Sequence, residues 1–407
     1  MRLLLAFLVA MVLPFMVQAE TRQHGNIIFN LPQDWSAGIL EDGILTLLYD
    51  PEDEVCEYCY AYVGPGAAKS GDLLTYVQQN ALTFLDEDDR DAAEDVQAPQ
   101  MTTIGNLPVA MAAYNASGNM LVVIGYDLPS RFELVAFEVD TGYEYEDAEP
   151  NLARMQQTIV PMFENLQFLS EGAKSLMPAP APGPLNGVWW GWYLSTGFGI
   201  DLMMRQEIDH RRMVFWSDGY FYDGTPPTGL APLDADALRA AGDGSFGTYR
   251  KIGTNVELTF ATGETETLRF VNADQLTDDN RDLYRSETPA DGTRLNGGVS
   301  SFYYSGFTPG AGIEGGVSSS SSTTFLPDGT YTGESFGGAF GNFVDGGGGV
   351  TGGFSTGGDG PQDGGSYEIR NGVLIQYPTD GSPPSVSMVI RTEEGLLIDD
   401  QWLEAAE

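Results

Sequence analysis

The chain has 407 residues, of which 42% are hydrophobic, so it is long enough for two or three domains with apolar cores. It carries 58 acidic against 19 basic side chains, and its formal net charge is −39. Nucleic acids and anionic lipid surfaces would repel such a chain, so neither is expected as a partner.

Residues 1–19 have the pattern of a secretory signal peptide. Arg2 is the single charge, an apolar run follows from Leu3 to Val17, and Ala19 supplies the small residue expected before a cleavage site. No later apolar run reaches the roughly 18 to 20 residues that a membrane-spanning helix needs. We therefore expect a periplasmic or secreted protein without a membrane span.

Residues 20–170 predict an α+β domain with two helices. Apolar residues at helical spacing predict one amphipathic helix over residues 71–85, capped by Ser70, and a second that begins at Pro150 and packs on the sheet. Short β-rich runs separated by Pro, Gly and Asp predict the strands of that sheet. These runs lie at residues 27–35, 44–49, 58–63, 101–104, 109–114, 120–126 and 132–139.

Three short motifs in this region carry a family resemblance. They are Phe-Asn-Leu-Pro-x-x-Trp at residues 29–35, Ile-Gly-Asn-Leu-Pro at 104–108 and Phe-x-x-Leu-x-Phe at 163–168. With these motifs, residues 24–170 resemble the PsbP/DcrB-like α/β sandwich family. The resemblance implies an antiparallel sheet packed against helices, and it brings no common catalytic site.

A proline-rich linker is expected at residues 171–184. Its segment 178–184 reads Pro-Ala-Pro-Ala-Pro-Gly-Pro, a composition typical of a stiff, extended spacer. It separates the first domain from two predicted β repeats, at residues 185–290 and 291–407.

Three motifs reveal the internal repeat. Leu-Asn-Gly at 185–187 recurs at 295–297, Asp-Gly at 218–219 recurs at 328–329, and Gly-x-Tyr at 247–249 recurs at 365–367. The third motif is displaced further because the second repeat carries a glycine-rich insertion at 337–365. Asp-Gly between apolar residues predicts a hairpin whose two central residues both have positive φ.

The expected fold class is therefore multidomain α+β. An N-terminal α/β sandwich with an antiparallel sheet and two helices precedes two all-β repeats that form barrels or sandwiches. In architecture alone, these repeats look like small lipocalin-like units of bacterial envelope proteins.

Two cysteines, Cys56 and Cys59, are the only thiols and predict a structural disulfide in an oxidising compartment. A redox pair is the alternative, whereas zinc would need carboxylate ligands because His24 and His210 are the only histidines. No metal site and no cofactor motif is predicted. The acidic run at 86–95 predicts a solvated loop, to which Ca²⁺ could bind only adventitiously.

An aromatic cluster, Trp-Trp-Gly-Trp-Tyr at residues 189–193, provides the candidate binding residue. Its counterparts at 299–303 are Val-Ser-Ser-Phe-Tyr, so Trp192 and Tyr193 keep aromatic partners and are predicted to be shared core. Trp190 stands opposite Ser300 and is free of that shared role. We therefore expect the first repeat to bind a flat ligand such as a sugar through Trp190, with core packing of this indole as the alternative.

No catalytic residue is predicted. The sequence favours a non-catalytic envelope protein that binds or assembles with a glycan or another envelope protein. The alternative is a hydrolase that acts on envelope polysaccharide through paired carboxylates.

Overall fold

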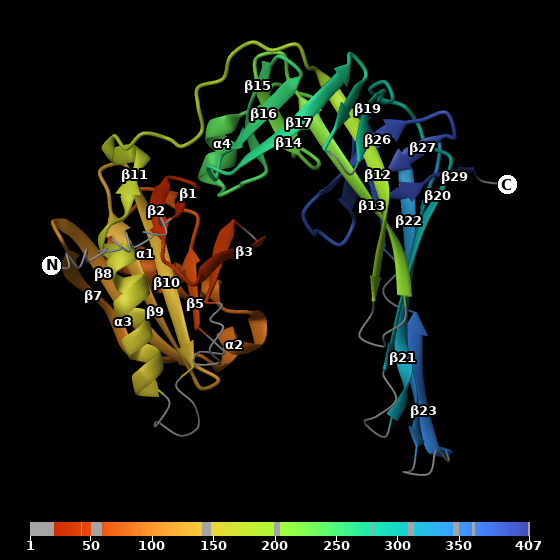
Figure 1. Ribbon diagram of the computed structural model, residues 1–407. Coiled ribbons are helices and arrows are strands. Elements are labelled where there is room, and N and C mark those ends of the chain that lie inside the picture. The colour runs from red at the N-terminus through yellow and green to blue at the C-terminus, as the bar shows by residue number, and fades with distance from the viewer. Residues whose placement is uncertain are drawn as a thin grey trace, which may run out of the picture. The chain divides into compact units, whose positions relative to one another are not determined.

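The computed structural model describes residues 20–41, 43–49, 59–140, 148–198, 204–278, 281–307, 313–344, 350–359 and 363–405. The predicted signal peptide lies outside these residues. The described chain is mostly β-structure and divides into two compact units (Figure 1). The first unit reaches Leu176 and also includes Asp236–Gly244 and Ala261–Gly263, and the second contains the remainder from Met177 onward.

The first unit contains two antiparallel sheets. The larger has the strand order β3-β4-β5-β10-β9-β8-β7, with β6 beside β10, and the smaller has the order β1-β2-β11. The strands are β1 (Glu20–His24), β2 (Ile27–Leu31), β3 (Trp35–Glu41), β4 (Ile44–Tyr49), β5 (Cys59–Val63), β6 (Ala67–Ala68), β7 (Glu94–Ile104), β8 (Leu107–Ala116), β9 (Asn119–Asp127), β10 (Arg131–Asp140) and β11 (Gln167–Phe168).

Both faces of the larger sheet are apolar and covered. Because successive residues of β10 point to opposite faces, Phe137 packs in a cluster with Met155 and Phe163 of α3 (Ala148–Glu164), as Figure 1 shows for the helix. Leu134 of the same strand packs on the other side with Val77 of α1 (Leu73–Asn80). The central strands are therefore hydrophobic on both sides.

The expected α+β class with two helices is wrong, since the described residues contain four α-helices within a mostly β chain. Besides α1 and α3 there are α2 (Glu87–Ala92) and α4 (Ala235–Ala240), and 3₁₀ turns follow at Ala81–Phe84 and Leu169–Glu171. The two extra helices have six residues each, too few for an apolar periodicity to reveal them.

The helix α2 replaces the solvated loop expected in the acidic run. The Asp86 side chain accepts a hydrogen bond from the Asp89 backbone N–H at 2.9 Å, which caps the helix. The same capping chemistry corrects the start of α1, where Asp72 rather than Ser70 accepts from the Thr75 backbone N–H at 3.0 Å.

His24 is a buried titratable group in the first unit, with 2% of its surface exposed. Its Nε2 lies 2.8 Å from the carbonyl oxygen of Gly43, so this nitrogen carries the proton. Gly242, in the segment after α4, approaches closely enough that a Cβ there would lie 3.0 Å from Nε2. Burial lowers the pKa of His24 to about 4, partly opposed by the hydrogen bond to Gly43. The imidazole is therefore neutral at pH 7.

In the second unit, the first repeat forms a closed barrel in which each strand pairs with the next and β19 pairs with β12. Its own core cluster includes Trp189, Phe215 and Leu268. The strands are β12 (Gly187–Phe198), β13 (Met204–Phe215), β14 (Tyr220–Asp223), β15 (Phe246–Ile252), β16 (Asn255–Phe260), β17 (Thr265–Asn272), β18 (Gln275–Thr277) and β19 (Asp282–Ser286).

The second repeat forms a ten-stranded sheet with a separate core around Leu295, Phe325 and Val389. The sheet nearly closes, because its terminal strands β28 and β29 are separated only by Leu403. The strands are β20 (Gly297–Phe307), β21 (Ile313–Phe325), β22 (Thr330–Val344), β23 (Val350–Asp359), β24 (Asp363–Arg370), β25 (Val373–Pro378), β26 (Ser385–Arg391), β27 (Leu396–Ile398), β28 (Gln401–Trp402) and β29 (Glu404–Ala405).

The described residues of the glycine-rich insertion lie mostly in strands. Most of residues 337–365 belongs to β22, β23 and the start of β24, and β23 pairs with β22 along its length. β21, β22 and β23 form a ribbon that extends away from the rest of the sheet (Figure 1).

The three sequence motifs of the repeat meet at one place in each repeat. The Tyr249 hydroxyl donates to the Leu185 carbonyl at 2.8 Å and accepts from the Leu185 N–H at 3.1 Å. The Tyr249 N–H donates to the carbonyl of Gly219, in the Asp-Gly turn, at 2.9 Å. Tyr367 makes the same contacts with Leu295 and Gly329. In both repeats a tyrosine therefore links the start of the repeat to its first hairpin.

The Asp-Gly hairpin differs from the expected two-residue turn. Gly219 and Gly329 have φ values of 102° and 94°, but neither Asp218 nor Asp328 has a positive φ. The N–H of Gly219 instead donates to the Trp216 carbonyl at 3.0 Å, which indicates a type I turn followed by a left-handed glycine. The aspartate caps this turn, since Asp328 Oδ1 accepts from the Thr330 N–H at 2.9 Å.

Replacing Tyr249 by phenylalanine should lower the free energy of unfolding of the first barrel by about 2 kcal/mol, because the buried N–H and C=O of Leu185 lose their partner. Hydrogen–deuterium exchange of β12–β19 in urea measures this change. Tyr377→Phe is the matched control, because its hydroxyl bonds the surface carboxylate of Glu368 at 2.8 Å. Equal effects of the two substitutions would contradict the role given to Tyr249.

The interior of the first barrel contains a charged cluster beside its apolar core. Arg211 lies on the interior face of β13, two residues before the buried Met213. Its guanidinium bonds Glu266 at 2.6 Å, Asp223 at 2.8 Å and Asp278 at 3.2 Å. Burial opposes the charge on Arg211, but the hydrogen bonds that it donates to Glu266 and Asp223 outweigh this effect and raise the pKa of the guanidinium.

The linker is not simply a spacer, because its second half packs on the barrel. The Gly183 N–H donates to the Ser217 carbonyl at 3.0 Å, and a Cβ on Gly183 would lie 2.5 Å from the Tyr249 ring. Gly219 is equally restricted, since a Cβ there would lie 2.1 Å from the Ala181 carbonyl oxygen. Small residues in the linker and in the hairpin thus allow the two backbones to lie in direct contact.

Candidate ligand-binding groove

The aromatic cluster lies on β12, and strand alternation sends its side chains to opposite faces. Trp189 is 1% exposed and packs edge-to-face on Phe215 inside the barrel, at 6.2 Å between ring centroids. Gly191 also faces inward, where a Cβ would lie 2.0 Å from the Asp282 carbonyl oxygen. Trp190 and Trp192 therefore point outward, on the same face of the strand.

The prediction that Trp192 belongs to the shared core is wrong, since 53% of its surface is exposed. Tyr193 faces inward but lies beneath a cation, with the Arg281 guanidinium 4.6 Å from its ring centroid. The core residue is Trp189, whose counterpart Val299 packs against the core of the second repeat. An aromatic residue at the matching position of the second repeat therefore did not predict that Trp192 is buried.

An open groove of about 560 Å³ lies over the outward face of β12 and β13, within the second unit. The volume falls in the range of about 300–1,000 Å³ typical of ligand sites. Both repeats contribute to its walls. The first supplies Trp190, Trp192, Ile208 and His210, and the second supplies Thr392, Glu393, Glu394, Asp400 and Trp402.

Trp190 and His210 form a less exposed part of the groove than Trp192, Ile208 and Trp402. Trp190 is half-buried, and its ring stacks on His210 with 5.7 Å between centroids and 19° between planes. Its Nε1 donates to His210 Nδ1 at 3.2 Å, which fixes the neutral tautomer protonated on Nε2. Burial lowers the pKa of His210, opposed by the nearby carboxylate of Asp400. The stacked pair thus presents an uncharged aromatic surface.

Three apolar side chains of the groove are exposed to solvent. Trp192 is 53%, Ile208 is 58% and Trp402 is 38% exposed. Large apolar side chains gathered on one open surface mark interaction sites more often than singly exposed ones do. The groove therefore has the physical character of a binding surface rather than of core packing.

Sequence comparison alone found only Trp190 among these residues. The lining from the second repeat lies after β26, far from the aromatic cluster in sequence, and is brought near by contacts between the repeats. The Arg212 guanidinium bonds Asp400 at 2.7 Å, and the Arg391 N–H donates to the Glu287 carbonyl at 2.8 Å. For Trp402, the sequence offered only the residue type itself, a tryptophan near the end of the chain.

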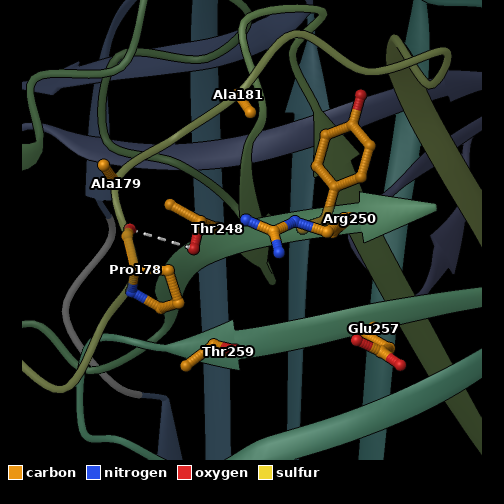
Figure 2. A pocket seen from close by; sticks show the side chains of 8 residues that line it. Pro178, Ala179, Ala181, Thr248, Arg250, Glu257 and Thr259 are labelled. Atoms are coloured by element: carbon orange, nitrogen blue, oxygen red, sulfur yellow. Dashed lines mark hydrogen bonds between the residues drawn. The ribbon is translucent and has the colours of Figure 1, made fainter. Parts of the chain in front are cut away.

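A second, smaller pocket lies between the linker and two barrel strands. Figure 2 shows Pro178, Ala179 and Ala181 beside β15, which bears Thr248 and Arg250, and β16, which bears Thr259. Thr248 Oγ1 donates to the Pro178 carbonyl at 3.3 Å. The pocket volume of about 70 Å³ is too small for a sugar ring or a similar organic ligand. This pocket belongs to the packing of the linker.

The predicted disulfide cannot be placed, because Cys56 lies outside the described residues. Cys59 begins β5 and is 2% exposed. Within the described part of the chain, no group of three His, Cys, Asp or Glu side chains is arranged to hold a metal ion. Nor does any described helix have the length and apolar content needed to cross a membrane.

No family model matches this chain, and no curated protein matches it. The resemblances to the PsbP/DcrB-like family and to lipocalin-like units therefore stay predictions. The function is therefore inferred from the groove.

Proposed function

We propose that this is a non-catalytic envelope protein, periplasmic or secreted, that binds a glycan in the groove. The observation that carries the proposal is the convergence of Trp190, Trp192 and Trp402 on one open groove. Two of these indoles are more than a third exposed, so their faces are available to a ligand. The signal-peptide pattern of residues 1–19 supports export.

A glycan suits this surface for two reasons. The apolar face of a sugar ring can stack on an indole, which contributes on the order of 1 kcal/mol for each good pair. The carboxylates and the Thr392 hydroxyl at the rim can form hydrogen bonds with sugar hydroxyls. An open groove also admits a polymer, whereas an enclosed cavity would admit only a small molecule.

The groove changes one expectation about the repeats. Trp190 was expected to act within the first repeat alone, but Trp402 and the acidic rim come from the second. Binding therefore requires both repeats, and a fragment containing only residues 185–290 should lose most of the affinity.

Replacing Trp192 by alanine should weaken oligosaccharide binding about five-fold, the loss of roughly 1 kcal/mol of stacking. Tryptophan fluorescence of the full chain, titrated with a panel of soluble oligosaccharides, measures the affinity. Tyr377→Ala is the matched control, since Tyr377 is 37% exposed on β25 and does not line the groove. Unchanged binding in Trp192→Ala, or no response to any glycan, would contradict the proposal.

The same incubation distinguishes binding from hydrolysis. A binding protein leaves each oligosaccharide intact, so the number of reducing ends stays constant. New reducing ends that disappear in Glu393→Gln or Glu394→Gln would instead support the polysaccharide hydrolase.

A further inference from the structure

The charges around the groove are strongly one-sided. Glu393 and Glu394 lie at its rim, and both are exposed. No ion pair involves either side chain among the residues that the structure describes. Asp400 adds a third carboxylate to the lining. A ligand in the groove therefore meets negative charge that the protein leaves largely uncompensated.

Two basic groups in contact with the lining, Arg212 and His210, do not offset this charge. Arg212 is already committed, with its Nη1 2.7 Å from Asp400 Oδ1 and 3.9 Å from Asp399 Oδ1. His210 is held in its neutral form by burial, as described above. Neither group remains available to attract an anion.

Like the carboxylates, the aromatic surface favours a positively charged ligand. The face of an indole is electron-rich and attracts a cation placed over it, by about 0.5–1 kcal/mol at an exposed site. Trp192 and Trp402 expose such faces beside the carboxylates. Stacking, cation–π attraction and charge complementarity therefore act together only when the ligand is both ring-shaped and cationic.

We propose that the groove is specific for an oligosaccharide that carries free, protonated amino groups, in preference to the corresponding N-acetylated or neutral sugar. This inference rests on the proposed glycan-binding function and names its ligand class. The sugar ring stacks on the exposed indoles, while its ammonium groups pair with Glu393 and Glu394. An N-acetyl sugar retains the stacking and loses the charge pairing.

The test compares two tetramers with the same backbone. The full chain is titrated at low salt with the β-1,4-linked glucosamine tetramer and with its fully N-acetylated form. The amino form should bind about ten-fold more tightly, and added salt should remove most of this preference because the carboxylates are exposed. In Glu393→Gln/Glu394→Gln the amino form should lose about ten-fold in affinity, and the N-acetylated form less than two-fold.

A control separates the groove from the overall acidity of a chain with a net charge of −39. Glu257→Gln/Asp274→Asn removes two exposed carboxylates from the barrel outside the groove, and should leave the preference intact. Tetralysine supplies the positive charge without a ring and should bind at least ten-fold more weakly than the amino tetramer.

The outcomes distinguish the two proposals. Equal affinity for the two tetramers, equal losses in both double variants, or tetralysine binding as tight as the amino sugar would overturn the amino-sugar inference. Binding of the N-acetylated tetramer in those cases would leave the glycan-binding function standing. Binding of neither tetramer would contradict the ligand class, and silence across the whole oligosaccharide panel would contradict both proposals.

Discussion

Replacing Arg211 by methionine should lower the free energy of unfolding of the first barrel by about 3–5 kcal/mol, the typical effect of removing one partner from a buried ion cluster. The Arg211 side chain is 14% exposed, and it bonds carboxylates that are 28%, 30% and 11% exposed. Without the guanidinium, Asp223 and Glu266 lose the arginine that they bond, whereas Asp278 keeps Arg281 at 3.6 Å.

Hydrogen–deuterium exchange of β12–β19 in urea reports this loss for the barrel separately from the rest of the chain. Arg250→Met is the matched control, because Arg250 is exposed on β15 and the structure gives it no ion pair with a described residue. Adding Glu266→Gln to Arg211→Met should recover part of the stability, since one uncompensated carboxylate is then removed. A loss below about 1 kcal/mol in Arg211→Met would show that the cluster is well solvated.

The first unit should lose about 3 kcal/mol of stability between pH 6.5 and pH 4 because of His24. The pKa of His24 is about 4 in the folded chain, below its ordinary value of 6.5, because burial disfavours the imidazolium. Between these two pH values the unfolded chain binds a proton that the folded chain does not. Acidification therefore favours unfolding, and the contribution is fully present only above pH 6.5.

The variant His24→Gln isolates this contribution, because glutamine can donate to Gly43 without titrating in this range. Urea unfolding, followed by exchange in β1 and β2, gives the free energy at each pH. Glu133 is also buried in this unit, and burial raises the pKa of its carboxyl, but that effect is common to both proteins and cancels in their difference. Parallel pH profiles for the two proteins would refute the assignment to His24.

The sequence predicted the internal repeat correctly, but it did not predict which aromatic side chains of β12 are exposed. Motifs at 185–187, 218–219 and 247–249 recur because one tyrosine hydroxyl and one glycine turn connect them, and these local contacts allow little substitution. The outward-facing residues of β12 are free of that constraint. Trp192 therefore has an aromatic counterpart in the second repeat, Phe302, although the Trp192 side chain is exposed. A comparison of the two repeats detects residues that make the same backbone contacts, but it does not show whether each side chain is buried.

A long helix was predictable from its apolar residues, but a short acidic helix was not. Over α3, seventeen residues carry a clear apolar stripe, whereas α2 is an acidic run whose helical state depends on the cap supplied by Asp86. The groove could not be predicted for a related reason. Its second wall, from Thr392 to Trp402, is placed by contacts between repeats, and no periodicity along the chain records those contacts.

Indole N–H resonances of the six tryptophans, recorded by NMR during titration with an oligosaccharide, test the groove most directly. Trp190, Trp192 and Trp402 line it, whereas Trp35, Trp189 and Trp216 are at most 8% exposed in the cores. We predict that the first three resonances shift with one common affinity while the other three stay in place. Shifts confined to the three buried tryptophans would contradict binding in the groove. The absence of any shift at high concentrations of both the amino and the neutral oligosaccharides would contradict it as well.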